Sequence, residues 1–298
     1  MPSIQSKITK WVLKFQFASW SAGTVDEQRA RQEKSAGLAR LPSGTTCKPV
    51  DVNGVPAEWI EAPHSSRGVI LYLHGGAYAL GSVNIHRELI ARLAHVTQCR
   101  ALAINYRLAP ENPFPAALED ALSAYRWLTT QFPPSQIIFA GDSAGGGLTL
   151  AALLSLRDQH QQLPAGAICI SPWADLELTG DSVQAKAKAD PILDRKSLAM
   201  YAGYYAGSHA RTSPLLSPLY ADLKGLPPLL IQVGADEILL DDSRRIAEHA
   251  RKAGVQTTLE VYDGMFHVFQ MMSFLPETTK ASNSIAAFAL NLLDEKRR

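Results

Sequence analysis

The stretch Ile137-Ile138-Phe139-Ala140-Gly141-Asp142-Ser143-Ala144-Gly145 decides the fold, because an apolar run turns at Gly-x-Ser-x-Gly into a long Ala/Leu segment, 148–156. A strand that turns sharply into a helix at such a pentapeptide is a nucleophile elbow, and the turn lifts the serine Oγ out of the sheet. Glycines are needed on both sides, since a Cβ there would collide with neighbouring backbone. The stretch therefore predicts Ser143 as a catalytic nucleophile.

Ser143 needs partners, because a serine hydroxyl is a poor nucleophile until a base accepts its proton and a third group orients that base. Enzymes built on this elbow supply them in the chain order serine, acid, histidine. His267 lies in the loop 263–267 after the last predicted strand and is the candidate base. Asp236 follows the apolar run 229–233, at the carboxyl end of a predicted strand, and is the candidate acid.

Other residues compete for both roles. Glu237, Asp241 and Asp242 crowd the segment of Asp236, which is favoured because the two later aspartates fall inside the helix that follows. The remaining histidines are placed elsewhere by their surroundings. His86, His95 and His249 fall on predicted helices and are expected at the surface. His64, His160 and His209 fall in polar loops, and His74 lies in a glycine loop, where an orienting role is expected.

The segment His74-Gly75-Gly76-Ala77 directly follows the apolar run 69–73 and predicts an oxyanion hole. Acyl transfer builds negative charge on the carbonyl oxygen, and backbone N–H groups aimed at that oxygen stabilise the transition state. A glycine loop lets the backbone approach a substrate closely. The predicted donors are the N–H groups of Gly75 and Gly76, completed by that of Ala144, the residue after the nucleophile.

Apolar runs alternate with amphipathic segments from residue 68 onward, which predicts an α/β fold with a mostly parallel sheet and helices on both faces. Helices are predicted over 85–96, 117–128 and 194–205, with a further one at the C-terminus. The alternation breaks between 173 and 224, as expected of an insertion that shapes a substrate pocket. Strands are predicted over 46–52, 57–62, 69–73, 101–105, 136–140, 167–170, 229–233 and 256–262.

The N-terminal segment has helical spacing of apolar residues, with lysines elsewhere on the wheel. Such a basic amphipathic helix can lie on a membrane, but packing of its apolar face on the protein itself is favoured. The lysines interrupt any signal-peptide core, and no apolar run is long enough to span a bilayer. A cytoplasmic location is therefore expected. The apolar residues are Ile4, Ile8, Trp11, Val12 and Phe15.

The composition excludes several classes of partner and cofactor. A net charge of +1 over 298 residues gives no reason to expect nucleic-acid binding. Cys47, Cys99 and Cys169 are odd in number and lack metal-ligand spacing, which favours unpaired thiols in a reducing compartment. Neither glycine pair has the spacing of a dinucleotide-binding loop, and no metal or organic cofactor is expected.

Several motifs together resemble those of the hormone-sensitive-lipase-like (bacterial family IV) esterases and lipases, within the α/β-hydrolase superfamily. The resemblance runs from about residue 68 to 267. It rests on the segments His74-Gly75-Gly76-Ala77-Tyr78, Tyr106-Arg107-Leu108-Ala109-Pro110-Glu111, Gly141-Asp142-Ser143-Ala144-Gly145-Gly146, Ser171-Pro172-Trp173, Asp190-Pro191 and Met265-Phe266-His267-Val268-Phe269. Two departures are Ala77, where many relatives have a third glycine, and Glu237-Ile238 after Asp236, where relatives often have proline and leucine.

The resemblance implies a Ser143–Asp236–His267 triad and a helical cap over the pocket. It divides the chain into N-terminal cap helices (1–45), a catalytic domain (46–172 and 225–298) and a cap insertion (173–224). It also implies a possible homodimer through the strand 256–262. The predicted activity is a carboxylesterase that hydrolyses short- to medium-chain carboxylic esters through an acyl-enzyme.

Alternatives with the same fold stay open from the sequence. A lipase, an amidase, a lactonase or an acyltransferase uses the same triad, and some plant hormone receptors keep the fold without the catalytic histidine. A small ester is the expected ligand, without stable membrane insertion. Soft or aromatic side chains near the predicted site or in the cap are candidates for the pocket wall: Tyr78, Trp173, Tyr201, Tyr204, Tyr205, Met265 and Phe266.

Overall fold

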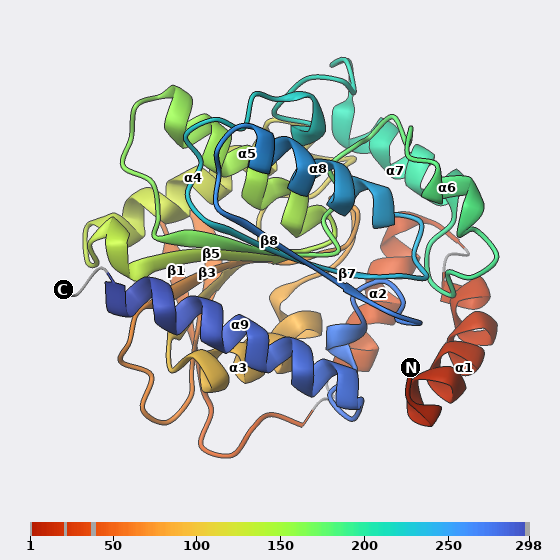
Figure 1. Ribbon diagram of the computed structural model, residues 1–298, viewed down its shortest axis with the longest axis horizontal. Helices are drawn as coiled ribbons and strands as arrows, with labels where there is room; N and C mark the ends of the chain where they lie inside the picture. Colours follow the sequence, from red (N-terminus) through yellow and green to blue (C-terminus); the bar gives the residue numbers. More distant parts are fainter. Residues whose placement is uncertain (1, 21–22, 37–39, 296–298) are drawn as a thin grey trace.

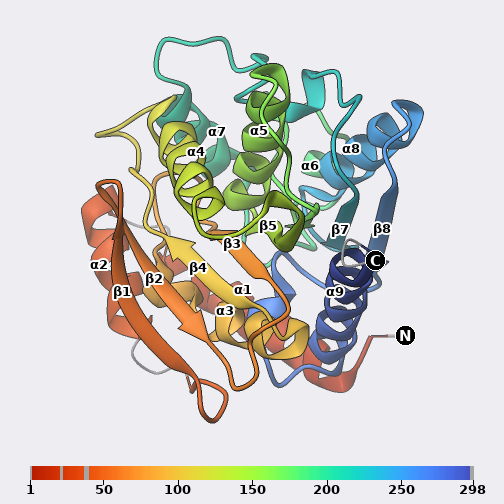
Figure 2. The ribbon, with the colours of Figure 1, turned by 90° about the vertical axis from the view of Figure 1, so that its left-hand side faces the viewer.

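The computed structural model describes residues 2–20, 23–36 and 40–295, except for the side chains of residues 15–20 and 35 (Figure 1). An eight-stranded sheet runs through the middle of this part of the chain (Figures 1 and 2). Its order is β1-β2-β4-β3-β5-β6-β7-β8; β2 is antiparallel to both neighbours and the other neighbouring pairs are parallel. The predicted mostly parallel α/β fold is confirmed.

All the predicted strands are present, with ends within about two residues of the expected ones. Strand β8 is at one edge of the sheet, and the predicted dimer contact through it stays a prediction. The strands are β1 (Thr46–Val52), β2 (Val55–Glu61), β3 (Val69–Leu73), β4 (Arg100–Ile104), β5 (Ile137–Asp142), β6 (Gly166–Ile170), β7 (Leu229–Gly234) and β8 (Thr257–Tyr262).

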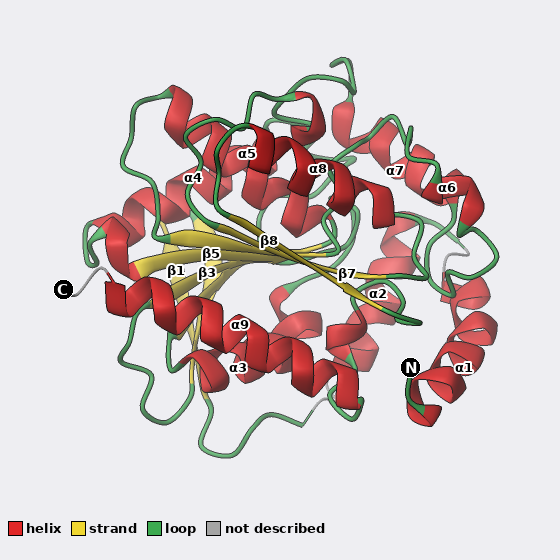
Figure 3. Ribbon diagram, viewed as in Figure 1, coloured by secondary structure: helices red, strands yellow, loops and turns green. Residues whose placement is uncertain are grey.

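Helices cover both faces of the sheet, as Figure 3 shows by the red ribbons above and below the yellow strands. On one face lie α4 (Ala116–Thr129), α5 (Ala144–Asp158) and α8 (Leu240–Lys252). On the other lie α3 (Val83–Thr97) and α9 (Pro276–Glu295). Because both faces are covered, β3, β5, β6 and β7 are buried at every position rather than at alternate ones.

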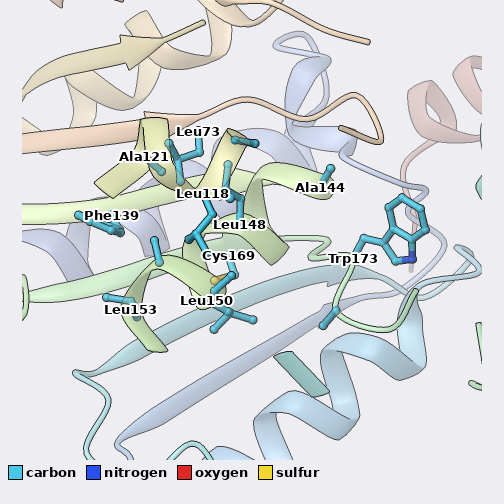
Figure 4. Packing of buried hydrophobic residues seen from close by; sticks show 14 of the residues in the cluster. Leu73, Leu118, Ala121, Phe139, Ala144, Leu148, Leu150, Leu153, Cys169 and Trp173 are labelled. Carbon is cyan, nitrogen blue, oxygen red and sulfur yellow. The ribbon is translucent and has the colours of Figure 1, made fainter. Parts of the chain in front are cut away.

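The side chains of β3 show how one strand contributes to two cores. Leu71 and Leu73 belong to the cluster packed under α4 and α5, whereas Ile70 and Tyr72 belong to the cluster packed under α3 and α9. All four are buried. Figure 4 shows the first cluster, in which Leu148 and Leu150 of α5 lie over Phe139 and Cys169 of the sheet. This packing against the sheet fixes the position of α5, and with it the residue that precedes α5.

The remaining helices lie outside these two layers. The segment 173–224 contains helices but no strand, which accounts for the break in the strand–helix alternation. The helices outside the two layers are α1 (Ile4–Trp20), α2 (Val25–Ala36), α6 (Ser182–Ala185), α7 (Arg195–Ala206) and the short 3₁₀ helices η1 (Pro134–Gln136), η2 (Pro218–Tyr220) and η3 (Phe269–Met271). In Figure 1, α1, α2, α6 and α7 gather on one side of the molecule.

Helix α1 packs on the protein, but not through the face that its apolar spacing predicts. Ile4, Ile8 and Trp11 are 74%, 59% and 64% exposed, and the side chain of Phe15 falls outside the described residues. The contact face is Ser6 and Leu13, which are buried. Polar contacts, rather than the apolar residues, set the orientation of α1, because residues at its start and on this face form hydrogen bonds with the rest of the protein. Ser3 bonds to Glu277, Lys10 to Asp236 and Lys14 to the Lys188 carbonyl.

No helix in the described ranges has the length and apolar character needed to cross a membrane.

Candidate active site

Ser143 lies at the junction of β5 and α5, in the sharp turn that the sequence predicts. Its φ of 53° and ψ of −121° are a sparsely populated conformation for a residue with a side chain. A Cβ on Gly141 would collide with the Gly145 carbonyl, and one on Gly145 would collide with the Leu73 carbonyl. The two glycines therefore allow α5 to start close to β3, and this close approach holds Ser143 above the sheet.

His267 comes from the loop after β8 and meets Ser143 directly. Its Nε2 lies 2.9 Å from Ser143 Oγ, and the two residues are 5% and 7% exposed. On the other side of the ring, Nδ1 lies 3.4 Å from Glu237 Oε1. An ionised carboxylate only accepts hydrogen bonds, so Nδ1 carries the proton and Nε2 is left to accept the hydroxyl of Ser143.

The carboxylate that contacts His267 is that of Glu237. The prediction that Asp236 would lie beside His267 is wrong. Asp236 turns the other way, toward Lys10 and toward Lys186 Nζ at 3.4 Å. The two residues sit in the turn after β7, where adjacent side chains leave the backbone in different directions. The longer side chain of Glu237 turns inward and is fully buried, at 0% exposure.

Two hydrogen bonds hold the second oxygen of Glu237. Ser171 Oγ donates to Oε2 at 2.8 Å, and the Gly234 N–H donates to it at 3.1 Å. Ser171 follows β6 and also accepts the N–H of Val268, the residue after the histidine, at 3.3 Å. Ser171 had no predicted role in the site. Its signal was the Ser171-Pro172-Trp173 motif at the end of a buried strand.

The charges around His267 favour its protonated form. Burial opposes charging of the ring, but the hydrogen bond and charge of Glu237, with the charges of Asp190 and Asp142, raise the pKa of His267 above its ordinary value. The Asp190 carboxylate accepts hydrogen bonds from the backbone N–H groups of Ile192, Leu193 and Ile238. Burial raises the pKa of the Asp190 carboxyl. A base poised in this way accepts a proton from Ser143 more readily than free imidazole does.

The glycine loop after β3 lies beside Ser143, as predicted, but one of its predicted oxyanion donors is wrong. The N–H of Gly75 donates to Asp142 Oδ1 at 3.0 Å, so it is not directed at a substrate and Gly75 is corrected as an oxyanion donor. Gly76 and Ala77 line the cavity in front of Ser143, and Ala77 takes a left-handed φ of 53°. Their N–H groups and that of Ala144 have no acceptor within the part of the chain that the structure describes.

Comparison with known proteins agrees with this geometry. A family model described as "alpha/beta hydrolase fold" matches residues 70–271. An acetyl-hydrolase of Streptomyces hygroscopicus is 44% identical over 271 residues, covering 89% of this chain and 90% of its own. An esterase of Acinetobacter venetianus is 41% identical, covering 82% of each chain.

The chain belongs to this α/β-hydrolase family. A crystal structure of an esterase from the bacterial hormone-sensitive lipase family superposes with a TM-score of 0.94 at 43% identity, covering 98% of this chain and 100% of the other. The resemblance noted in the motifs is thereby confirmed. With Ser143 and His267 in contact, this family member is a serine carboxylic-ester hydrolase.

The hydrolase has a cavity of about 630 Å³ in front of the nucleophile, lined by Ser143, His267 and Gly76. Its walls come from segments far apart in the sequence, including α1, α2, α3, α7 and η3. Most of the wall is apolar. The apolar wall residues are Leu13, Ala36, Ala77, Leu80, Ile85, Leu89, Ile192, Leu193, Leu198, Tyr201, Val268, Met271, Met272 and Phe274.

The predicted pocket residues are mostly not part of this wall. Of the seven, Tyr201 lines the cavity. Five pack as buried core side chains and Tyr204 is half-buried; the rings of Tyr78 and Tyr205, for example, stack 3.6 Å apart. Leu198 lines the wall and is not among the predicted pocket residues. Its signal was helical spacing, since Leu198 and Tyr201 are three residues apart on the predicted helix 194–205.

Proposed function

We propose that this hydrolase cleaves short- to medium-chain carboxylic esters through an acyl-enzyme on Ser143, with His267 as base and Glu237 as acid. The observation that carries the proposal is the pair of contacts on one ring, Nε2 to Ser143 Oγ at 2.9 Å and Nδ1 to Glu237 Oε1 at 3.4 Å. A nucleophile within reach of a base, itself oriented by a third group, is the arrangement that acyl transfer requires.

The reaction follows from these positions. His267 Nε2 takes the hydroxyl proton while Ser143 Oγ attacks the ester carbonyl carbon, giving a tetrahedral oxyanion. The bond to the alcohol oxygen then breaks, and His267 returns the proton to that oxygen. Water attacks the resulting acyl-enzyme while His267 accepts a proton from it, and collapse of the second oxyanion releases the acid and regenerates Ser143.

The oxyanion is stabilised in this proposal by the N–H groups of Gly76, Ala77 and Ala144. All three lie next to Ser143 in the loop after β3 or at the start of α5. Each donor aimed at developing charge is worth about 2.7–4 kcal/mol of barrier. Ala77 stands where many relatives have glycine, and its left-handed backbone supplies the same amide at the cost of some strain.

The preference for small esters rests on the cavity and on one relative. Helices α1, α2 and α7 contribute walls to a cavity of about 630 Å³, as expected of a cap that limits the acyl group. We assign residues 1–45 and 173–224 to that cap, and 46–172 with 225–298 to the catalytic domain. The relative from Streptomyces hygroscopicus is named an acetyl-hydrolase. A cytoplasmic location fits the three unpaired cysteines.

Replacement of the nucleophile tests the proposal. Ser143→Ala should lower turnover of p-nitrophenyl butyrate by at least about 10⁴-fold, because it removes the hydroxyl that His267 Nε2 contacts. A series of p-nitrophenyl esters from acetate to palmitate should show highest kcat/KM among the short acyl chains. Near-normal activity of Ser143→Ala would refute the nucleophile, and a maximum at palmitate would refute the substrate class.

A further inference from the structure

Behind the glycine loop lies a buried polar cluster that takes no direct part in the proposed proton transfers. Its centre is Asp142, the residue before the nucleophile, which is 2% exposed. Oδ1 of Asp142 accepts the Tyr72 hydroxyl at 2.8 Å and the Gly75 N–H at 3.0 Å. Oδ2 lies 3.3 Å from His86 Nε2. One carboxylate thus joins β3, β5, α3 and the loop that carries the oxyanion donors.

His86 was predicted to be a surface residue, and the structure places it in this cluster at 4% exposure. Its Nδ1 lies 2.9 Å from the Ser82 carbonyl oxygen, which can only accept a hydrogen bond. Its Nε2 faces the carboxylate of Asp142. Both ring nitrogens therefore point at acceptors, and only the imidazolium form donates from both.

We infer that His86, as an imidazolium paired with Asp142, is a positioning residue that holds the Gly75–Ala77 loop in place for catalysis; this inference rests on the proposed function. The pair acts through Gly75. A Cβ on Gly75 would collide with Asp142 Oδ2, so the loop backbone sits directly against the carboxylate. The next two residues carry the proposed oxyanion donors, and a small displacement of such donors costs much of their effect.

The charge of His86 also matters for the oxyanion itself. An uncompensated carboxylate adjacent to Ser143 would repel the negative charge that develops on the substrate oxygen, and in a buried site such repulsion is poorly screened. The imidazolium neutralises that carboxylate. Asp142 also acts on the catalytic base, since its charge contributes to the raised pKa of His267.

The surrounding titratable groups are consistent with one positive charge on His86. Burial opposes it, but the charge and hydrogen bond of Asp142, with the Ser82 carbonyl, raise the pKa of His86 above its ordinary value. Burial also opposes ionisation of Asp142, yet the charge of His86 and the hydrogen bonds from His86 and Tyr72 lower the pKa of that carboxyl.

Three other ionisable side chains around this pair, those of His74, Tyr72 and Tyr106, favour their neutral forms. His74 stacks between His86, at 5.5 Å, and Tyr106, at 4.3 Å between ring centroids. Burial and the charge of His86 lower the pKa of His74 to about 3, so a second positive charge does not compete for Asp142. Burial and the charge of Asp142 raise the pKa of the Tyr72 and Tyr106 phenols well above their ordinary value. The loop is therefore held by a single ion pair.

Kinetics of His86→Gln test the inference, because glutamine keeps a donor but cannot carry the charge. Its kcat for p-nitrophenyl butyrate should fall about 10- to 100-fold with KM within about twofold, since the loss falls on oxyanion stabilisation rather than on binding. His249→Gln is the matched control, because His249 sits on α8 with Nδ1 3.3 Å from the Leu219 carbonyl, away from the site. It should match the wild type.

Two further readouts separate positioning from general loosening of the fold. The wild type should lose kcat at alkaline pH as His86 gives up its proton, and this alkaline loss should be absent in His86→Gln. In a double-mutant cycle, Asp142→Asn and His86→Gln should be strongly non-additive, because removing either partner already breaks the pair. Tyr72→Phe, which removes a neutral donor to the same carboxylate, should cost less than about fivefold.

The outcomes distinguish this inference from the proposed function. If Ser143→Ala abolishes hydrolysis but His86→Gln retains wild-type kcat, or shows the wild-type alkaline profile, the positioning role is overturned and the mechanism stands. Nitrogen-15 NMR of the histidine side chains gives an independent check. A neutral His86 ring at pH 7, with one nitrogen unprotonated, would overturn the ion pair; a doubly protonated ring supports it.

Discussion

In the proposed mechanism, Glu237 controls which nitrogen of His267 carries the proton. Its Oε2 is fixed by Ser171 and Gly234, which leaves Oε1 facing the ring. Asp236, one residue earlier, is 24% exposed at its side chain and paired with lysines. A carboxylate that orients a catalytic histidine must be buried and rigid, and of these two neighbours Glu237 meets that requirement.

Glu237→Gln should therefore lower kcat for p-nitrophenyl butyrate by about 10³–10⁴-fold, since an amide N–H facing Nδ1 stabilises the wrong tautomer of His267. Asp236→Asn should cost less than about fivefold, because it removes only a partly exposed ion pair. Steady-state kinetics of the two neighbouring variants decide between them. The reverse order of severity would return the role of acid to Asp236.

The pH dependence of kcat/KM should report the protonation of His267. The base works only when neutral, so activity should rise as the pH increases through the pKa of His267, which is raised above that of free imidazole. In Glu237→Gln the residual activity should begin to rise at lower pH, because the main cause of the raised pKa has been removed. A midpoint for the wild type below that of free histidine would contradict this assignment.

At the scale of elements, helix α1 is held over the cavity by polar contacts rather than by its apolar residues. Leu13 lines the cavity, and the neighbouring contact is the ion pair of Lys10 with Asp236. Asp236 also pairs with Lys186, in the segment just after α6. One aspartate next to the acid therefore ties both parts of the proposed cap to the catalytic layer.

Lys10→Met should loosen α1 without touching the chemistry. A half-buried ion pair of this kind is worth up to about 1 kcal/mol, so KM for p-nitrophenyl butyrate should rise at most about fivefold while kcat stays within about twofold. High salt should produce part of the same rise in the wild type.

The matched control is Lys7→Met, on the exposed side of the same helix. Its KM should equal that of the wild type. A fall in kcat for Lys10→Met as large as that of Glu237→Gln would show that α1 takes part in the chemistry, contrary to this view.

For the whole molecule, the cavity exists only because regions far apart in the sequence converge on it. Residues as distant as Leu13, Leu89, Leu198 and Phe274 share its wall. The segment after β8 brings His267 and Met271 to the cavity, and α1 and α7 contribute Leu13 and Leu198 to other parts of its wall. Substrate size is thus a property of the assembled layers and not of any single motif.

The layered sheet, the elbow at Ser143 and the loop of His267 could be predicted from the sequence, because each depends on local rules. Apolar runs of strand length, helical spacing and a glycine-framed serine carry their own geometric requirements. The glycine loop was also found at the right place. The prediction of the Gly75 N–H as an oxyanion donor was wrong, because that N–H bonds to Asp142, a residue 67 positions away.

Short-range backbone and burial preferences fix the order of strands and helices and the positions of Ser143 and His267, so these could be predicted from the residues alone. Three other features became visible only in the folded chain: Glu237 rather than Asp236 faces His267, His86 is buried against Asp142, and α1 exposes its apolar residues. Each of those outcomes depends on which way a side chain leaves the backbone and which distant group it meets. Such contacts between residues far apart in the sequence leave no periodic pattern along the chain from which they could be predicted.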